Sequence, residues 1–275
     1  MTRRWLVTGC SSGLGAALAR AVAAAGDTVL ATARKPETLD ALVAAHPDRV
    51  TVAALDIRDP EQCAEAVRIA EDRLGGIDVL VNNAATGLLG AVEEVSDEEL
   101  REQLEVLAVA PWRLTRLVLP GMRARRGGHI VNVSSIAGRL SFPGMGAYVA
   151  GKHALEGMAL ALAPEVEPFG IKVTTMEPGG FATRYGSSAA EPARRLPAYR
   201  GAAVDFTRDG VRGMTDNPEL GRPEDFAALV LRIVAADRTP LRMPVGADAY
   251  QYLEAVHEQN GADLAAAKAF AAGAP

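Results

Sequence analysis

A tyrosine and a lysine four residues apart, Tyr148 and Lys152, are the residues best placed to do chemistry in this chain. Side chains at positions i and i+4 share one face of a helix. A phenol has a reference pKa of about 10, and a neighbouring ammonium group is expected to lower that pKa. The pair therefore predicts a hydroxyl that exchanges a proton with a substrate oxygen.

A second chemical signal is the glycine-rich segment Thr8-Gly-Cys-Ser-Ser-Gly-Leu-Gly15, which follows an apolar stretch and precedes an alanine-rich helical pattern. Gly9 permits a tight turn, Gly13 lets the backbone approach a phosphate, and Gly15 lets the helix pack closely on the strand. The start of the helix adds free N–H groups and a positive dipole end. Glycines between a strand and a helix predict a dinucleotide site, and together with the phenol they suggest carbonyl–alcohol redox chemistry.

Segments with strand and helix patterns alternate along the chain, which suits one large α/β domain spanning residues 1–275. We expect strands at 5–8, 28–32, 50–55, 77–81, 129–133, 171–176 and 241–245. We expect helices at 13–25, 36–45, 60–74, 96–125, 147–169 and 223–236, with a kink at Pro111. The pattern predicts a Rossmann-type, doubly wound parallel sheet of about seven strands, with ligands at the carboxyl ends of the strands.

The segment at about 179–222 departs from this alternation. It is rich in Gly, Ser, Arg and Pro, and a long segment of this kind predicts a lid or substrate loop. Arg194, Arg195 and Arg200 in it could meet an acidic substrate, but solvated loop charges are the favoured interpretation. The tail from about residue 248 has a helical pattern.

Composition excludes several classes of function. A net charge of -5 gives no support for nucleic-acid binding, and no apolar run reaches the roughly 20 residues of a membrane span. Cys10 and Cys63 form no disulfide framework, and His46, His129 and His257 have no ligand spacing, so we expect no metal. These features predict a reduced, cytoplasmic protein that acts on a small molecule.

The end of the second predicted strand bears on the choice of cofactor. NAD-preferring folds place an acidic residue near this point, whereas this chain has Arg34 and Lys35. A cation suits the 2′-phosphate, so the sequence favours NADP(H) over NAD(H). Solvated surface charges are the alternative interpretation.

These motifs resemble the classical short-chain dehydrogenases/reductases over nearly the whole chain up to about residue 248. The segment Asn82-Asn-Ala-Ala85 is similar to the family's Asn-Asn-Ala-Gly, and Ser135 lies 13 residues before Tyr148, as in the family motif. The resemblance implies that Ser135, Tyr148 and Lys152 are catalytic. It implies a cofactor site made of Gly9, Ser11, Ser12, Gly13, Leu14, Gly15, Arg34, Lys35, Asp56, Ile57, Asn83, Ala84, Tyr148, Lys152, Pro178, Gly179, Phe181 and Thr183.

The sequence around the motifs is similar to that of the hydroxysteroid- and retinol-dehydrogenase-like branch. This resemblance implies a bulky, fairly apolar ketone, aldehyde or alcohol as substrate. One position departs from the family. Its fourth catalytic residue is an asparagine that holds a water near the lysine, and Leu107 stands at that place. One interpretation is that protons reach the lysine by another route and the redox reaction is kept. The other is that the chain is a non-redox enzyme (dehydration, cyclisation or isomerisation) or a regulatory binder on the same scaffold. The first interpretation is favoured, and family resemblance also implies a homodimer or homotetramer.

Overall fold

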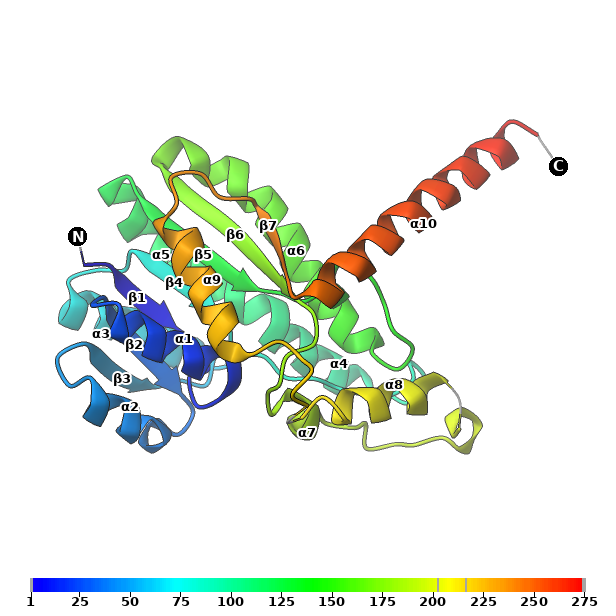
Figure 1. Ribbon diagram of the computed structural model, residues 1–275, viewed down its shortest axis with the longest axis horizontal. Coiled ribbons are helices and arrows are strands. Elements are labelled where there is room, and N and C mark those ends of the chain that lie inside the picture. The colour runs from blue at the N-terminus through cyan, green and yellow to red at the C-terminus, as the bar shows by residue number, and fades with distance from the viewer. Residues whose placement is uncertain (1, 202, 216, 274–275) are drawn as a thin grey trace.

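The structure is a computed structural model that describes residues 2–201, 203–215 and 217–273, and its strands form one parallel sheet (Figure 1). The sheet has seven strands in the order β3-β2-β1-β4-β5-β6-β7 within these residues. They are β1 (Arg4–Val7), β2 (Thr28–Ala33), β3 (Val50–Ala54), β4 (Val79–Asn82), β5 (Gly128–Val133), β6 (Ile171–Pro178) and β7 (Arg242–Val245). The predicted doubly wound parallel sheet is confirmed, with the order reversing between β1 and β4.

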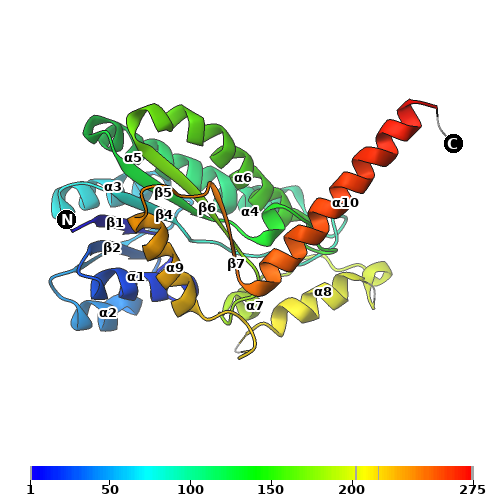
Figure 2. The same ribbon diagram turned by 45° about the horizontal axis from the view of Figure 1, so that its top comes forward.

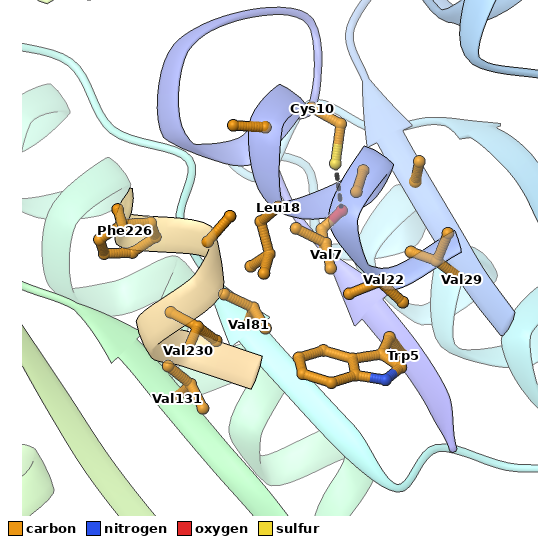
Figure 3. Close-up of a cluster of buried hydrophobic side chains, with 14 of the residues drawn as sticks. Trp5, Val7, Cys10, Leu18, Val22, Val29, Val81, Val131, Phe226 and Val230 are labelled. Atoms are coloured by element: carbon orange, nitrogen blue, oxygen red, sulfur yellow. Dashed lines mark hydrogen bonds between the residues drawn. The ribbon is translucent and has the colours of Figure 1, made fainter. Parts of the chain in front are cut away.

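Helices cover both faces of the sheet (Figure 1). On one face α1 (Gly13–Ala24) and α9 (Pro223–Ala235) bury an apolar cluster that includes Trp5, Leu18 and Phe226 (Figure 3). On the other face α3 (Pro60–Leu74), α5 (Ala110–Arg125) and α6 (Gly146–Val166) bury a second cluster around Leu80, Ile130 and other strand residues. Alternate strand residues therefore point into two separate cores, as expected for parallel strands that are buried on both faces.

Local sequence signals explain several helix ends. Ser96 and Glu99 form a reciprocal capping box that starts α4 (Asp97–Leu104). The Asp59 carboxylate accepts the N–H groups of Glu61 and Gln62 at the start of α3, and Gly75 ends α3 in the left-handed conformation. One prediction was only partly right: residues 36–45 divide into a 3₁₀ turn (Pro36–Leu39) and a short helix, α2 (Asp40–Ala45).

The helix expected over 96–125 contains a turn of π-helix at Glu105–Val109, between α4 and α5. We expected the irregularity at Pro111, and it lies in the turn before it. Proline has no N–H, so it cannot donate to the carbonyl four residues earlier, which belongs to Leu107. The wider π turn thus coincides with the point where the regular hydrogen-bond ladder has to be interrupted.

The segment at 179–222 carries α7 (Tyr185–Ser188), a 3₁₀ turn (Pro197–Tyr199) and α8 (Ala203–Arg212). Of its arginines, Arg195 is held in ion pairs with other residues of the chain and does not line the cleft described below. Its Nε lies 3.2 Å from Oε1 of the fully buried Glu94, and its guanidinium also pairs with Asp205. Arg195 therefore fastens this segment to the loop that precedes α4.

The tail forms α10 (Ala247–Ala271), which starts beside β7 and projects away from the body of the molecule (Figures 1 and 2). Within the described residues, no helix is both long enough and apolar enough to cross a membrane. Cys10 and Cys63 are free and buried, and burial raises the pKa of the Cys10 thiol to about 12. The Cys10 thiol is therefore unreactive at neutral pH.

A buried histidine on β5 predicts acid sensitivity. His129 Nε2 lies 2.9 Å from Thr174 Oγ1, and burial, assisted by the charges of Lys172 and Arg3, lowers the pKa of His129 to about 4. The unfolded chain has a histidine pKa of about 6.5, so the neutral ring favours the folded state above pH 6.5. That contribution is lost as the pH falls from 6.5 towards 4.

We expect the free energy of unfolding to lose about 1–2 kcal/mol between pH 7 and pH 5 through His129 alone. Urea titrations at both pH values would give the free energy of unfolding of the wild type and of His129→Gln. The contribution of His129 is the difference between the two proteins in how much this free energy changes from pH 7 to pH 5. His257→Gln, on the exposed part of α10, is the control and should follow the wild type. If the free energy of unfolding changed by the same amount with pH in the wild type and in His129→Gln, this account would be contradicted.

Candidate active site

A cleft of about 1250 Å³ opens at the carboxyl ends of the strands and is covered by the segment 179–222. This is the position at which doubly wound sheets bind ligands. The predicted residues that line it are Gly9, Ser11, Ser12, Gly13, Leu14, Arg34, Asp56, Ile57, Asn83, Ala84, Ser135, Tyr148, Lys152, Pro178, Gly179, Phe181 and Thr183. Two predicted cofactor residues, Gly15 and Lys35, are not among the lining residues.

The glycine turn is shaped to leave room for a ligand. Gly9 and Gly13 have positive φ values of 72° and 56°, which side chains disfavour. Gly15 lies against the loop after β4, where a Cβ would overlap the Asn83 amide nitrogen and the Gly9 carbonyl oxygen. Asn83 also fixes the turn by donating from Nδ2 to the Thr8 carbonyl at 2.8 Å. Gly15 therefore lets the turn pack against the loop after β4.

The first residues of α1 line the cleft. The Ser12 side chain, at the N-cap, makes no hydrogen bond to the N–H groups of this helix start, so they are available to a ligand. Such a helix start, next to glycines that admit a close approach, fits a pyrophosphate. The chain therefore carries the features that a dinucleotide needs at this end of the cleft.

Charged residues gather at the far end of the cleft. Arg34, just after β2, and Asp56, after β3, both line it. A residue that the sequence analysis missed, Arg58, binds the Asp56 carboxylate at 2.6 Å and lowers its pKa. Lys35 is the N-cap residue of the short 3₁₀ turn that follows β2 and does not line the cleft.

The three predicted catalytic residues meet in the middle of the cleft. Ser135 follows the end of β5, and its hydroxyl accepts the Ala137 N–H at 3.1 Å. Tyr148 and Lys152 lie one turn apart on α6, both buried. The Lys152 ammonium donates to the Val133 carbonyl at 2.7 Å and lies 5.7 Å from the centroid of the Tyr148 ring.

The electrostatics of this group differ from the expectation in one respect. Burial raises the pKa of the Tyr148 phenol, and the hydroxyls of Ser135 and Tyr185 oppose this effect only in part. Burial also lowers the pKa of Lys152 to about 8, while Glu156 acts in the opposite direction. We expected the ammonium to lower the phenol pKa, but in this site burial raises it. At neutral pH the phenol therefore carries its proton.

The loop after β6 forms the third wall and is held from a distant element. Asp248, in the first turn of α10, accepts the Gly180 N–H at 2.7 Å. A Cβ at Gly179 would overlap that carboxylate, which explains the need for glycine. Thr183 approaches the glycine turn from this side, since its side chain lies 3.3 Å from where a Cβ of Gly13 would be.

Tyr185 on α7 is the main cleft residue that the sequence analysis missed. Its ring lies 5.6 Å from that of Tyr148, and its hydroxyl is buried beside the Tyr148 phenol. Nothing in the local sequence marks it, because its role depends on the segment 179–222 folding back over α6. Apolar side chains complete this wall, among them Leu88, Phe142, Met145, Phe206, Val211, Met214 and Leu220.

Leu107 is buried in the π turn, and its side chain packs on α6 beside Lys152. A Cβ at Gly151 would lie 2.8 Å from the Cβ and Cδ1 atoms of Leu107, so only glycine fits at this crossing. His153, which we considered as an aid to Lys152, is exposed, and its Nδ1 lies 3.0 Å from the Val149 carbonyl. It therefore faces away from the cleft. The residues that the structure describes contain no group of three potential metal ligands.

Comparisons with known proteins agree with this geometry. A profile described as short chain dehydrogenase matches residues 3–193. An oxidoreductase, BOA17, of Botryotinia fuckeliana (strain B05.10) is 38% identical over 253 residues, 92% of each chain. Human retinol dehydrogenase 8 is 34% identical over 254 residues, 87% of this chain and 80% of that one. A crystal structure of a short-chain dehydrogenase from Streptomyces avermitilis has 43% identity and a TM-score of 0.91, covering 99% of this chain and 98% of that one.

The packing of the glycine turn predicts that Gly15→Ala is strongly destabilising. The new methyl group meets backbone and a fixed amide, so the free energy of unfolding should fall by about 1–3 kcal/mol. Gly157→Ala in α6 is the matched control, because nothing lies within 4 Å of its Cβ position. It should be neutral or stabilising by up to about 1 kcal/mol. Equal stability of the two variants in urea titrations would show that the turn is not close-packed.

Proposed function

The chain belongs to the short-chain dehydrogenase family and is an NAD(P)-dependent oxidoreductase, and we propose that it is an NADPH-dependent reductase of a bulky, apolar ketone or aldehyde. The observation that carries this proposal is the convergence of Ser135, Tyr148 and Lys152 in one cleft with a phenol that keeps its proton. A protonated, buried phenol is a proton donor to a carbonyl oxygen.

In the proposed mechanism, NADPH supplies the hydride for the carbonyl carbon. Tyr148 donates its phenolic proton to the carbonyl oxygen as negative charge grows there. The Ser135 hydroxyl donates a hydrogen bond to the same oxygen and stabilises that charge. Lys152, a buried ammonium beside the phenol, stabilises the phenolate that forms and supplies the proton that restores it. Oxidation of an alcohol uses the same groups in reverse.

The proposed preference for NADP(H) rests on the far end of the cleft. The Asp56 carboxylate is bonded to Arg58, so the charge of Arg34 is available for a phosphate. The cofactor would lie along Gly9, Ser11, Ser12, Gly13, Leu14, Asp56, Ile57, Asn83, Ala84, Tyr148, Lys152, Pro178, Gly179, Phe181 and Thr183.

The proposed substrate class rests on the apolar wall from the segment 179–222 and the neighbouring loops. Phe142, Met145, Val211 and Met214 line the cleft together with the catalytic residues. The chain is similar to retinol dehydrogenase 8, which is named for an apolar alcohol, and this similarity supports a substrate of this kind.

Leu107 motivates a second candidate function, which is a non-redox reaction or regulatory binding on the same scaffold. We infer that Leu107 stands in place of the family asparagine, because it lies in an irregular turn and packs beside Lys152. Its side chain has no group to hold a water. The redox proposal is the stronger one because the remaining catalytic residues are together in the cleft.

We also propose a homodimer or homotetramer that pairs the outer faces of α5 and α6. Trp112 is 59% exposed on α5, Val109 just before it is 44% exposed, and Leu160 on α6 is 43% exposed. Large apolar side chains at the surface of two neighbouring helices favour contact with another chain.

The redox proposal predicts that Tyr148→Phe abolishes carbonyl reduction. The change removes the proton donor but keeps the ring, so the rate of NADPH oxidation with a panel of ketones should fall at least about 100-fold. NADPH binding, followed by fluorescence, should stay unchanged. Tyr252→Phe, at the half-exposed rim of the cleft, is the control. Undiminished turnover in Tyr148→Phe would refute the mechanism, and product formed without loss of NADPH would favour the non-redox candidate.

The cofactor proposal predicts that Arg34→Ala raises KM for NADPH about tenfold or more while leaving KM for NADH unchanged. One charge-assisted bond to the 2′-phosphate accounts for a change of this size. Lys35→Ala removes the neighbouring cation outside the cleft and should leave both constants unchanged. Equal effects of Arg34→Ala on the two cofactors would count against the assignment.

A further inference from the structure

A pair of buried carboxylates lies behind Lys152, between α6 and the sheet. Glu156 follows Lys152 by one helical turn, and its side chain is 4% exposed. Glu177, near the end of β6, is fully buried. Two arginines meet them: Arg242 on β7 lies 3.1 Å from Glu156 and 3.6 Å from Glu177, and Arg139 lies 3.1 Å from Glu177. The reaction as proposed uses none of these four charges.

Several polar atoms in the same place lack a protein partner. Oε1 of Glu156, Oγ of Ser134 and Oγ1 of Thr175 are buried and make no hydrogen bond with a described residue. The first two flank Gly138, where a Cβ would lie 2.6 Å from Ser134 Oγ and 3.3 Å from Glu156 Oε1. Buried polar atoms nearly always have a partner, and where protein supplies none, the partner is an internal water.

Strand register makes these groups one continuous band. Thr175 on β6 pairs with Asn132 on β5 and with Arg242 on β7, so the three side chains share one face of the sheet. Glu177 is two residues further along β6 and has the same phase. Val173, two residues before Thr175, also points to this face of the sheet and belongs to the apolar cluster beneath α5 and α6. The band therefore lies under α6.

The band lies between Lys152 and two partly exposed arginines. At its inner end, the Lys152 ammonium is bonded to the Val133 carbonyl, next to Ser134 in the chain. At its outer end, the side chains of Arg139 and Arg242 are each 32% exposed. Arg242 contacts both carboxylates and Arg139 contacts Glu177, so each carboxylate lies next to a partly exposed side chain.

We propose that this band, made of Ser134, Glu156 and Glu177 with internal waters, is the route by which protons travel between solvent and Lys152. The proposal rests on the redox function above and replaces the relay that Leu107 lacks. During reduction, Tyr148 loses its proton to the substrate oxygen and Lys152 returns one to the phenolate. A proton taken up from solvent by Glu177 then passes to the Glu156 carboxylate and from there to the Lys152 amine. During oxidation each proton moves in the opposite direction.

The charges around Glu156 suit this transfer. Lys152 faces it from α6, Glu177 from β6 and Arg242 from β7, while Arg139 reaches Glu177 from the turn after β5. Two arginines balance two ionised carboxylates. Burial, followed by repulsion from Glu156, raises the pKa of Glu177, so Glu177 binds a proton more readily than an exposed carboxylate does.

The test compares Glu156→Gln and Ser134→Ala with the wild type under saturating NADPH and ketone. Both variants interrupt the band, so kcat should fall about tenfold or more, with KM values unchanged. The solvent deuterium isotope effect on kcat should increase, because proton delivery becomes limiting. Glu165→Gln, an exposed carboxylate on the same helix, is the control and should match the wild type. Ser134→Ala carries the test if Glu156→Gln does not fold, since it removes only one unpartnered hydroxyl.

Values of kcat and isotope effect within twofold of the wild type, in variants with unchanged melting temperatures, would overturn the route and leave the redox function standing. If the wild type oxidises no NADPH with any ketone, the function fails, and a high-resolution crystal structure then decides about the band. Ordered water bonded to both Ser134 Oγ and Glu156 Oε1 would support it, and a dry contact between them would overturn it.

Discussion

The burial of the Lys152 ammonium is the constraint on which the rest of the site depends. A charge that is 2% exposed requires compensation, which the Val133 carbonyl, the Tyr148 ring and Glu156 provide. Two of these partners lie on α6 itself, and the third is the end of β5. The position of α6 over the sheet, and hence the place of the phenol, is therefore fixed by where that ammonium is satisfied.

Close packing around the same helix makes the constraint strict. Gly151 precedes Lys152 and is the point at which Leu107 reaches α6, so neither helix can shift without a clash or a cavity. On the sheet side, Gly138 leaves room for Ser134 and Glu156. Small residues on both sides of one lysine thus explain how a buried charge, an apolar contact and a polar band fit within a few ångströms.

Most of the fold and the centre of the site could be predicted from the sequence, because their signals are local. The glycine turn, the strand ends and the i, i+4 pair on α6 depend only on neighbouring residues. Predictions failed where distant elements decide the outcome. Arg195 is held by Glu94, about a hundred positions away, and Tyr185 enters the cleft because its segment folds back over α6. The pKa of Tyr148 was predicted in the wrong direction because spacing shows the ammonium but does not show how completely the phenol is buried.

The same burial bears on the direction in which the site is prepared to work. With the pKa of Lys152 at about 8 and that of Tyr148 raised, both groups hold their protons at pH 7. A site in this state is ready to give a proton to a carbonyl oxygen, whereas oxidation of an alcohol first requires a proton to leave. Every turnover of reduction nevertheless removes one proton from a place shielded from water. A buried donor is therefore useful only if the protein also carries a path that refills it, and the carboxylates behind Lys152 are the ionisable groups that lie between it and the partly exposed Arg139 and Arg242.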